Sequence, residues 1–234
     1  MSGLTANLLS ILGIILALPS IIALFCSPYR ATAILGLILG LAIIAFVIIF
    51  KWYSSRPPWS IIEYHKILKI KTRSGRTAQI TMINKIRANH GGLTEFIHRN
   101  IRSDGQIKNF RFGSNPVPVS DITTEAQEFI VHERFAREAH RGEILSSHLT
   151  FDLIDSYKEA HNFTGHVPDF FTTKAKIEIH FPKSRPPRNA KAYRGIGAER
   201  CELGVPIIST DGNVAIWEGA KLKPGQRYRV EWDW

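Results

Sequence analysis

Two groups of basic side chains in this sequence could bind a phosphorylated ligand. One lies in the proline-braced segment FPKSRPPRNAKAYRG, residues 181–195, and the other straddles the NHGG turn at residues 89–92. A guanidinium group can donate two hydrogen bonds to one phosphate, and a tyrosine ring can stack on a nucleotide base. We therefore predict a ligand-binding site formed by Arg185, Arg188, Tyr193, Arg194, Arg99 and Arg102.

The same basic residues allow two simpler interpretations. They could form a rim that contacts anionic lipid, or they could be ordinary solvated arginines. Long nucleic acid is not expected as a partner, because a domain tethered to a bilayer would rarely meet it.

Catalytic and metal-binding motifs are not found in the sequence. His132 and His140 are eight residues apart, which fits no tight metal motif, and there is no HExxH, CxxC or GxSxG. The segment RGIGAER at residues 194–200 lacks the third glycine of a dinucleotide-binding loop. A membrane-tethered hydrolase would need an acid, a base and a nucleophile that converge on one site, and we find no such set in the sequence. We therefore expect a protein that is not an enzyme, with no catalytic residue, no cofactor and no metal.

Charge is distributed very unevenly along the 234 residues. The chain carries a formal charge of +10, and Arg30 is the only charged side chain among residues 1–50, so the remainder carries +9. That remainder is long enough for one domain with a substantial core. Its positive charge suits an anionic membrane surface, an anionic ligand or both, although solubility alone could also explain it.

Two apolar runs, residues 4–26 and 31–50, each have the length that a helix needs to cross about 30 Å of hydrocarbon. Only SPYR separates them, and Pro28 in this segment interrupts a helix. A cleaved signal peptide is the competing interpretation of the first run, but MSGLTANLL lacks the positive charge of such a peptide. We therefore predict a two-helix transmembrane hairpin over residues 1–52.

Gly36 and Gly40 lie one helical turn apart in the second run. Small residues at this spacing let helices approach closely, so they predict a helix association face and a homo-oligomer. The alternative is that the two spans pack on each other within one chain.

Lys51 and Arg56 begin a basic stretch that follows the second span, against Arg30 alone in the short loop. The positive-inside rule therefore places both termini in the cytoplasm. Cys201 is the one cysteine outside the apolar runs, which suits a reducing compartment.

Residues 53–60 are predicted to form a stiff juxtamembrane linker. Pro57 and Pro58 favour an extended path, and Trp52, Tyr53 and Trp59 suggest an aromatic belt at the membrane interface.

The region 61–234 alternates apolar and polar residues, which predicts strands. Segments 61–72, 76–89, 93–102 and 106–112 are joined by short turns and predict an antiparallel meander. Further strands are expected within 142–157, 174–181, 213–219 and 227–234. The segment 128–140 alternates as a strand does, although TTEAQE before it suits the start of a helix, and we favour the strand. This pattern favours an antiparallel β-barrel, with an immunoglobulin-like β-sandwich as the alternative.

The layout of LLSILGIILALPSIIALF and AILGLILGLAIIAFVIIF followed directly by strands resembles the two-transmembrane β-barrel effectors of bacterial cyclic-oligonucleotide antiphage signalling. The resemblance covers the plan of the whole chain and rests on no aligned motif. It implies a cytoplasmic barrel that binds a cyclic nucleotide, oligomerisation through the membrane helices, and disruption of the bacterial inner membrane in antiviral defence. The alternative is a non-catalytic membrane scaffold that binds a protein partner or anionic lipid.

Overall fold

The computed structural model describes residues 14, 30–54 and 56–234. The first predicted span, residues 4–26, therefore lies outside the described residues except for Ile14. The chain divides into two compact units between Arg56 and Pro57, and this boundary falls inside the predicted linker 53–60.

Helix α2 (Arg30–Ser54) contains a segment, Ile34–Lys51, that is long and apolar enough to cross a membrane. Its 25 residues correspond to about 37 Å of helix, more than the hydrocarbon core requires. Gly40 is buried and Gly36 half-buried, whereas Leu35 and Leu39 are exposed, so α2 has one covered face and one exposed apolar face. Among the described residues this is the one candidate span, and a second crossing stays a prediction.

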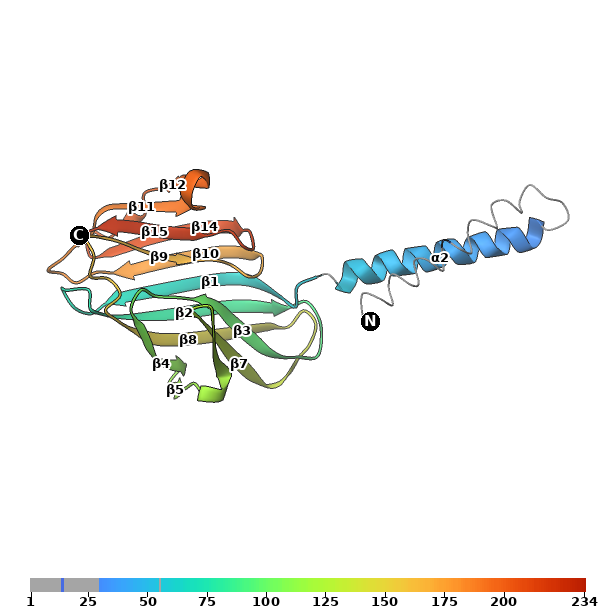
Figure 1. Cartoon of the computed structure of the whole chain (residues 1–234), viewed down its shortest axis with the longest axis horizontal. Coiled ribbons are helices and arrows are strands. Elements are labelled where there is room, and N and C mark those ends of the chain that lie inside the picture. Colours follow the sequence, from blue (N-terminus) through green and yellow to red (C-terminus); the bar gives the residue numbers. More distant parts are fainter. Residues whose placement is uncertain (1–13, 15–29, 55) are drawn as a thin grey trace. The chain divides into compact units, whose positions relative to one another are not determined.

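The second unit is a β domain built around an eight-stranded sheet (Figure 1). Its order is β13-β14-β10-β1-β2-β8-β4-β5. The strands are β1 (Trp59–Ile70), β2 (Thr77–Ala88), β4 (Gln106–Phe112), β5 (Asn115–Pro116), β8 (Ile144–Ile154), β10 (Thr172–His180), β13 (Ile207–Ile208) and β14 (Val214–Leu222). Neighbouring strands are antiparallel except for β1 and β10, which are parallel.

Two smaller sheets complete the domain. One has the order β12-β11-β15-β9 and the other β3-β7-β6. Their strands are β9 (His161–His166), β11 (Arg188–Arg194), β12 (Cys201–Gly204), β15 (Tyr228–Asp233), β3 (Leu93–Ile101), β6 (Ile122–Glu125) and β7 (Glu128–Ala139). Two 3-10 turns, η1 (Val119–Asp121) and η2 (Gly197–Glu199), lie in the connections.

The core lies between the large sheet and the two smaller ones. Rings from opposite layers meet there: Trp217 of β14 stacks on Tyr228 of β15, and Phe110 of β4 contacts Phe129 of β7. Trp232, the largest fully buried side chain, belongs to the same core cluster. All described residues of this core belong to the β domain, so we expect the domain to fold without the helix.

The strand pattern of the sequence predicted the inward faces correctly. Ala175, Ile177, Ile179 and Phe181 are all buried, as are Leu149, Phe151 and Leu153. The segment 128–139, for which the sequence favours a strand over a helix, is strand β7.

The barrel prediction is wrong, because the eight-stranded sheet ends at β13 on one side and β5 on the other and does not close. The predicted meander is also wrong beyond β1 and β2. Strand β2 pairs along its whole length with β8, and β3 leaves for another sheet. The sandwich alternative describes the layering, but the eight-stranded sheet is wider than either sheet of an immunoglobulin-like fold.

The prediction that Trp59 belongs to an aromatic belt at the membrane interface is wrong. Trp59 is only 3% exposed, donates from Nε1 to the carbonyl oxygen of Glu95 at 3.2 Å, and packs edge-on against Phe96. It is therefore a core residue of the domain. The side-chain Nδ2 of Asn89 donates to the carbonyl oxygen of Pro57 at 2.9 Å, and its backbone N–H donates to the carbonyl oxygen of Pro58 at 2.9 Å. The β domain therefore begins at Pro57.

Candidate ligand-binding cavity

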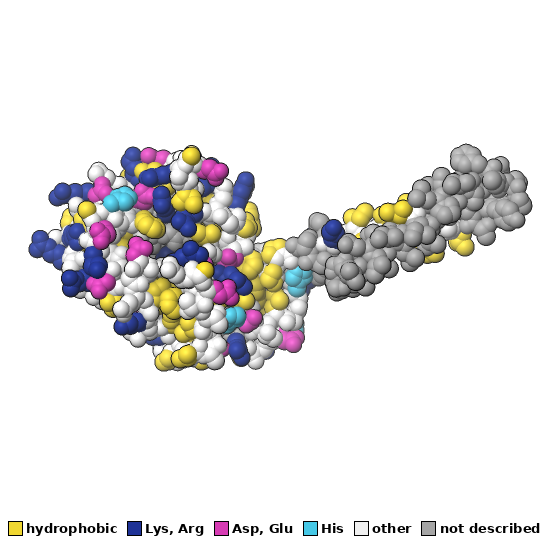
Figure 2. Space-filling model, viewed as in Figure 1, with side chains coloured by type: hydrophobic (Ala, Val, Ile, Leu, Met, Phe, Trp, Pro, Cys, Tyr) yellow, Lys and Arg dark blue, Asp and Glu magenta, His cyan; other side chains and the backbone are white. Residues whose placement is uncertain are grey.

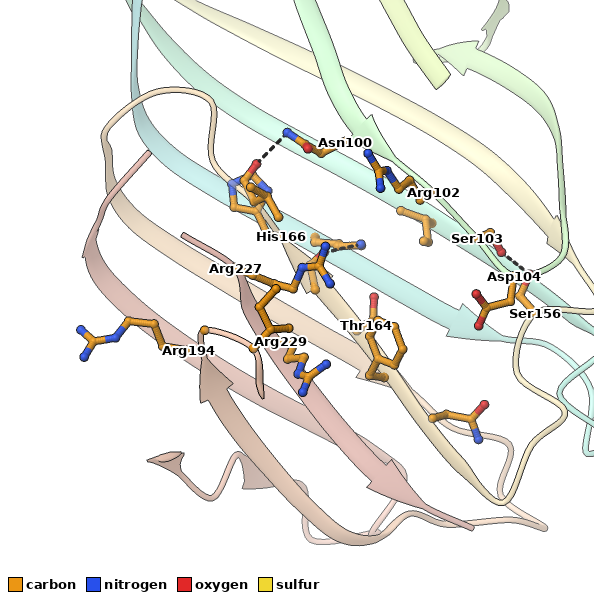
Figure 3. A pocket seen from close by; sticks show the side chains of 18 of the residues that line it. Asn100, Arg102, Ser103, Asp104, Ser156, Thr164, His166, Arg194, Arg227 and Arg229 are labelled. Atoms are coloured by element: carbon orange, nitrogen blue, oxygen red, sulfur yellow. Dashed lines mark hydrogen bonds between the residues drawn. The ribbon is translucent and has the colours of Figure 1, made fainter. Parts of the chain in front are cut away.

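A cavity of about 760 Å³ lies beside β9, the edge strand of the four-stranded sheet (Figure 3). All six residues of β9 line it, so the cavity extends along this edge. Lys66 of β1 and Ile80 of β2 contribute from the large sheet, and the segment that follows β3 contributes from the three-stranded sheet. The volume is in the range of sites that hold drug-sized ligands and cofactors.

Lys66 is the most unusual side chain of this cavity. It occupies an inward position of β1, between the buried residues Tyr64 and Leu68. Its Nζ donates to the carbonyl oxygen of Gly165 at 2.7 Å, and no carboxylate lies within 4.0 Å of it in the described part of the chain. Burial lowers the pKa of Lys66 to about 8, so the amine is still mostly protonated at neutral pH. The cavity therefore contains a largely buried positive charge that has no carboxylate partner among the described residues.

His166 lies next to this lysine. Its ring stacks on Tyr64 with centroids 3.7 Å apart. Burial, and after it the charge of Lys66, lowers the pKa of His166 to about 3, so the imidazole is neutral at physiological pH. Its buried Nε2 has no hydrogen-bond partner in the described structure. A neutral ring nitrogen can donate a hydrogen bond to a ligand or accept one from it, depending on the tautomer.

Arginine side chains add to the positive charge of the cavity. Arg102 binds Glu128 at 2.7 Å, and Arg229 binds Glu231 at 2.6 Å while lying over the ring of Phe163. Arg227 makes no ion pair with any described residue. The acidic residues of the lining are Asp104, Glu159 and Glu199, fewer than the basic ones. A ligand with negative charge is therefore favoured over a cation.

The six residues predicted to bind a ligand lie in different parts of the β domain. Arg102 and Arg194 both line the cavity, although Arg194 points away from the other labelled side chains in Figure 3. Arg185 and Arg188 lie together at a separate hollow. The six residues thus do not form one site.

The remaining two predicted residues contact neither hollow. Tyr193 carries the guanidinium group of Arg200 on its ring at 3.6 Å. Arg99 lies close to Asp169. Burial raises the pKa of Asp169 above its ordinary value, and the charge of Arg99 offsets only part of this rise.

Sequence reasoning missed the basic residues Lys66, Arg227 and Arg229 of the cavity and the neutral His166 beside them. A signal for Lys66 exists in YHKILKI, because alternation from Tyr64 to Leu68 places this lysine on the buried face. No comparable signal exists for Arg227, which precedes β15, or for Arg229, which reaches the cavity through the pairing of β15 with β9.

A contact between Ser147, His98 and Glu133 has the residue types of a hydrolase triad but not its geometry. Ser147 Oγ and Glu133 Oε2 both lie 3.0 Å from the same nitrogen, His98 Nε2. A triad needs the acid on the opposite ring nitrogen. Ser147 is also fully buried, so these residues join two layers of the core and do not present a nucleophile. The described residues include no cluster of three His, Cys, Asp or Glu side chains that could hold a metal.

Comparisons with known proteins leave the family open. No protein-family model and no curated protein matches the sequence. An M1 zinc metallopeptidase from Deinococcus radiodurans is similar over 74% of this chain and 42% of its own, with 10% identity and a TM-score of 0.42. A proposed protease from Parabacteroides distasonis is similar over 77% of this chain and 41% of its own, with 10% identity and a TM-score of 0.47. The chain thus spans less than half of these proteins, and likeness at this level assigns it neither a family nor an activity.

Proposed function

We propose that this protein is a membrane-anchored sensor whose cytoplasmic β domain binds an anionic ligand, specifically a cyclic nucleotide. Ligand binding drives oligomerisation of the membrane helices and thereby disrupts the bacterial inner membrane. The main support for an anionic ligand is the ammonium group of Lys66, which lines a cavity of about 760 Å³ and has no carboxylate partner in the described part of the chain. The membrane anchor is supported by the apolar helix α2.

Charge and shape together favour a ligand with phosphate groups and rings. Arg227 and Arg102 supply guanidinium groups around the cavity, and Phe163 supplies an aromatic ring that is 44% exposed. Phosphates bind guanidinium and ammonium groups, and bases stack on aromatic rings. The choice of a cyclic nucleotide among such ligands rests on the resemblance of layout.

The test is thermal unfolding of the full chain in nonionic detergent with a panel of cyclic di- and trinucleotides at fixed salt. A ligand at a hundredfold excess over its Kd stabilises the native state by about 2.7 kcal/mol. We expect one member of the panel to raise Tm, and we expect Lys66→Met to weaken its binding at least tenfold. Lys69→Met, on the exposed side of the same strand, is the matched control and keeps wild-type binding.

Membrane disruption needs a separate assay. The full chain is reconstituted in vesicles that contain a self-quenched dye, and the binding nucleotide is added. Release of dye from vesicles with wild-type protein but not with Lys66→Met supports the sensor. Ligand binding without release would retain the sensor and remove the membrane-disrupting step.

The alternative, a non-catalytic membrane scaffold, is favoured by a different observation. Val205 and Ile207, near the edge of the large sheet, are 69% and 71% exposed. Exposed apolar residues at a sheet edge suit a protein partner. A folded chain that responds to no nucleotide of the panel would favour this alternative.

A further inference from the structure

A second group of basic side chains surrounds a smaller hollow of about 290 Å³. Arg73 comes from the turn between β1 and β2, Arg185 comes from the connection of β10 to β11, and Arg188 is the first residue of β11. Ser184, Pro186 and Trp234 complete the lining. Figure 2 shows Lys and Arg side chains gathered at the end of the β domain where Figure 1 marks the C-terminus.

Arg185 is held in place before any ligand binds. Its guanidinium group lies over the Trp234 ring, 4.1 Å from the centroid, and its Nη1 donates to the carbonyl oxygen of Arg73 at 3.0 Å. The backbone amide of Arg185 donates to the carbonyl oxygen of Pro182 at 2.8 Å, and two prolines follow in the sequence. A fixed guanidinium group loses little conformational freedom when it binds an anion.

The three arginine side chains at this hollow make no ion pair with a described residue. None of the six lining side chains is acidic, and no described carboxylate lies within 4.0 Å of the guanidinium groups. Arg76, three residues after Arg73, differs in this respect because its Nε lies 3.8 Å from Asp155.

The side chain of Asp233, which precedes Trp234, already has other partners. Asp233 pairs with Arg188 in the β11–β15 ladder, but its carboxylate binds His161 at 2.8 Å and Asn189 at 3.1 Å. Burial, and next the charge of Arg73, lowers the pKa of Arg185, as expected where like charges are held close together. An anion between these groups would relieve their repulsion.

We propose that the hollow formed by Arg73, Arg185 and Arg188 is a second anion-binding site, which takes the phosphate group of a small phosphorylated molecule or of a lipid headgroup. The site is independent of the Lys66 cavity and of the nucleotide that this cavity is proposed to bind. Its chemistry is bidentate hydrogen bonding from guanidinium groups to phosphate oxygens.

The test measures binding of inorganic phosphate to the full chain in nonionic detergent by thermal shift, with sodium chloride added to hold ionic strength constant. A second arm uses mixed micelles that contain phosphatidic acid, compared with micelles that contain phosphatidylcholine. Binding in the first arm identifies a free phosphate as a sufficient ligand, and binding in the second arm alone identifies a lipid headgroup.

The variants separate this site from general charge effects. We expect Arg73→Gln and Arg188→Gln, both at exposed side chains, to weaken phosphate binding at least tenfold. Arg76→Gln is the matched control in the same turn and leaves binding unchanged. Equal binding by all three variants, or no binding by the wild-type chain in either arm, would overturn the proposal.

Discussion

The imidazole of His166 lies flat on the phenol ring of Tyr64, with ring centroids 3.7 Å apart and an angle of 15° between the planes. The two residues come from different sheets, because Tyr64 belongs to β1 and His166 to β9. The stack therefore joins the large sheet to the edge strand of the ligand cavity. It also excludes water from the imidazole and keeps this group neutral.

This stack predicts acid sensitivity of the β domain. The pKa of His166 is about 3 in the folded state, against an ordinary value of 6.5. The unfolded chain therefore binds one more proton than the folded chain between these pH values. The stabilising contribution is fully present above pH 6.5 and is lost as the pH falls, by about 1.4 kcal/mol per pH unit.

The measurement compares the free energy of unfolding of residues 57–234 in urea at pH 7 and pH 5. His166→Phe keeps a ring on Tyr64 but cannot titrate, so its stability should fall less over this interval than that of the wild-type domain, by roughly 2 kcal/mol. His148→Gln changes an exposed histidine on β8 and serves as the control. Equal pH dependence of His166→Phe and the wild-type domain would contradict a neutral, buried imidazole.

Lys66 predicts a stability change at the alkaline end. Its pKa is about 8 in the folded state and 10.5 ordinarily, so the unfolded chain binds more protons between these values. The folded state of the wild-type domain should therefore gain stability relative to Lys66→Met as the pH rises from 8 to 10, by roughly 2 kcal/mol. Urea unfolding at both pH values, with Lys69→Met as the control, measures this difference. Parallel curves for wild type and Lys66→Met would show that the amine is solvated.

Gly75 predicts a steric requirement at the turn between β1 and β2. Its φ is +74°, and a Cβ atom added there would lie 1.7 Å from the carbonyl oxygen of Tyr157, which lines the ligand cavity. Gly212 has a similar φ of +71° but open space around the position of a Cβ atom. We expect Gly212→Ala to cost about 1 kcal/mol of backbone strain and Gly75→Ala on the order of 3 kcal/mol or more. Urea unfolding of the two variants gives the comparison, and equal losses would mean that the Tyr157 backbone moves freely.

Local patterning predicted much of the β domain from the sequence. The side-chain alternation of Ala175, Ile177 and Ile179 fixed which face of β10 is buried, because period two is a property of each strand by itself. The pairing of strands is not local. The ladder between Thr77 and Ile154 joins residues far apart in the chain, and no turn signal encodes it. The barrel prediction failed at this point.

The candidate site illustrates the same division. Basic residues in the sequence indicated anion binding, but only the fold shows that Arg102 and Arg185 lie at different hollows. Lys66 could have been noticed as a charged residue at an inward strand position. This lysine has no carboxylate partner among the described residues, and that feature depends on β9 packing over β1, which cannot be read from the sequence.

Gly36 and Gly40 predict that assembly depends on the face of α2 that carries them. A leucine at position 40 would prevent the close approach of a helix from another copy, which needs small residues at this spacing. We expect Gly40→Leu to reduce oligomer size in detergent, measured by light scattering, while the Tm of the β domain stays unchanged. Ala42→Leu makes a similar increase in side-chain size on the exposed face and is the matched control. Loss of assembly in Ala42→Leu but not in Gly40→Leu would move the contact between copies to the exposed apolar face.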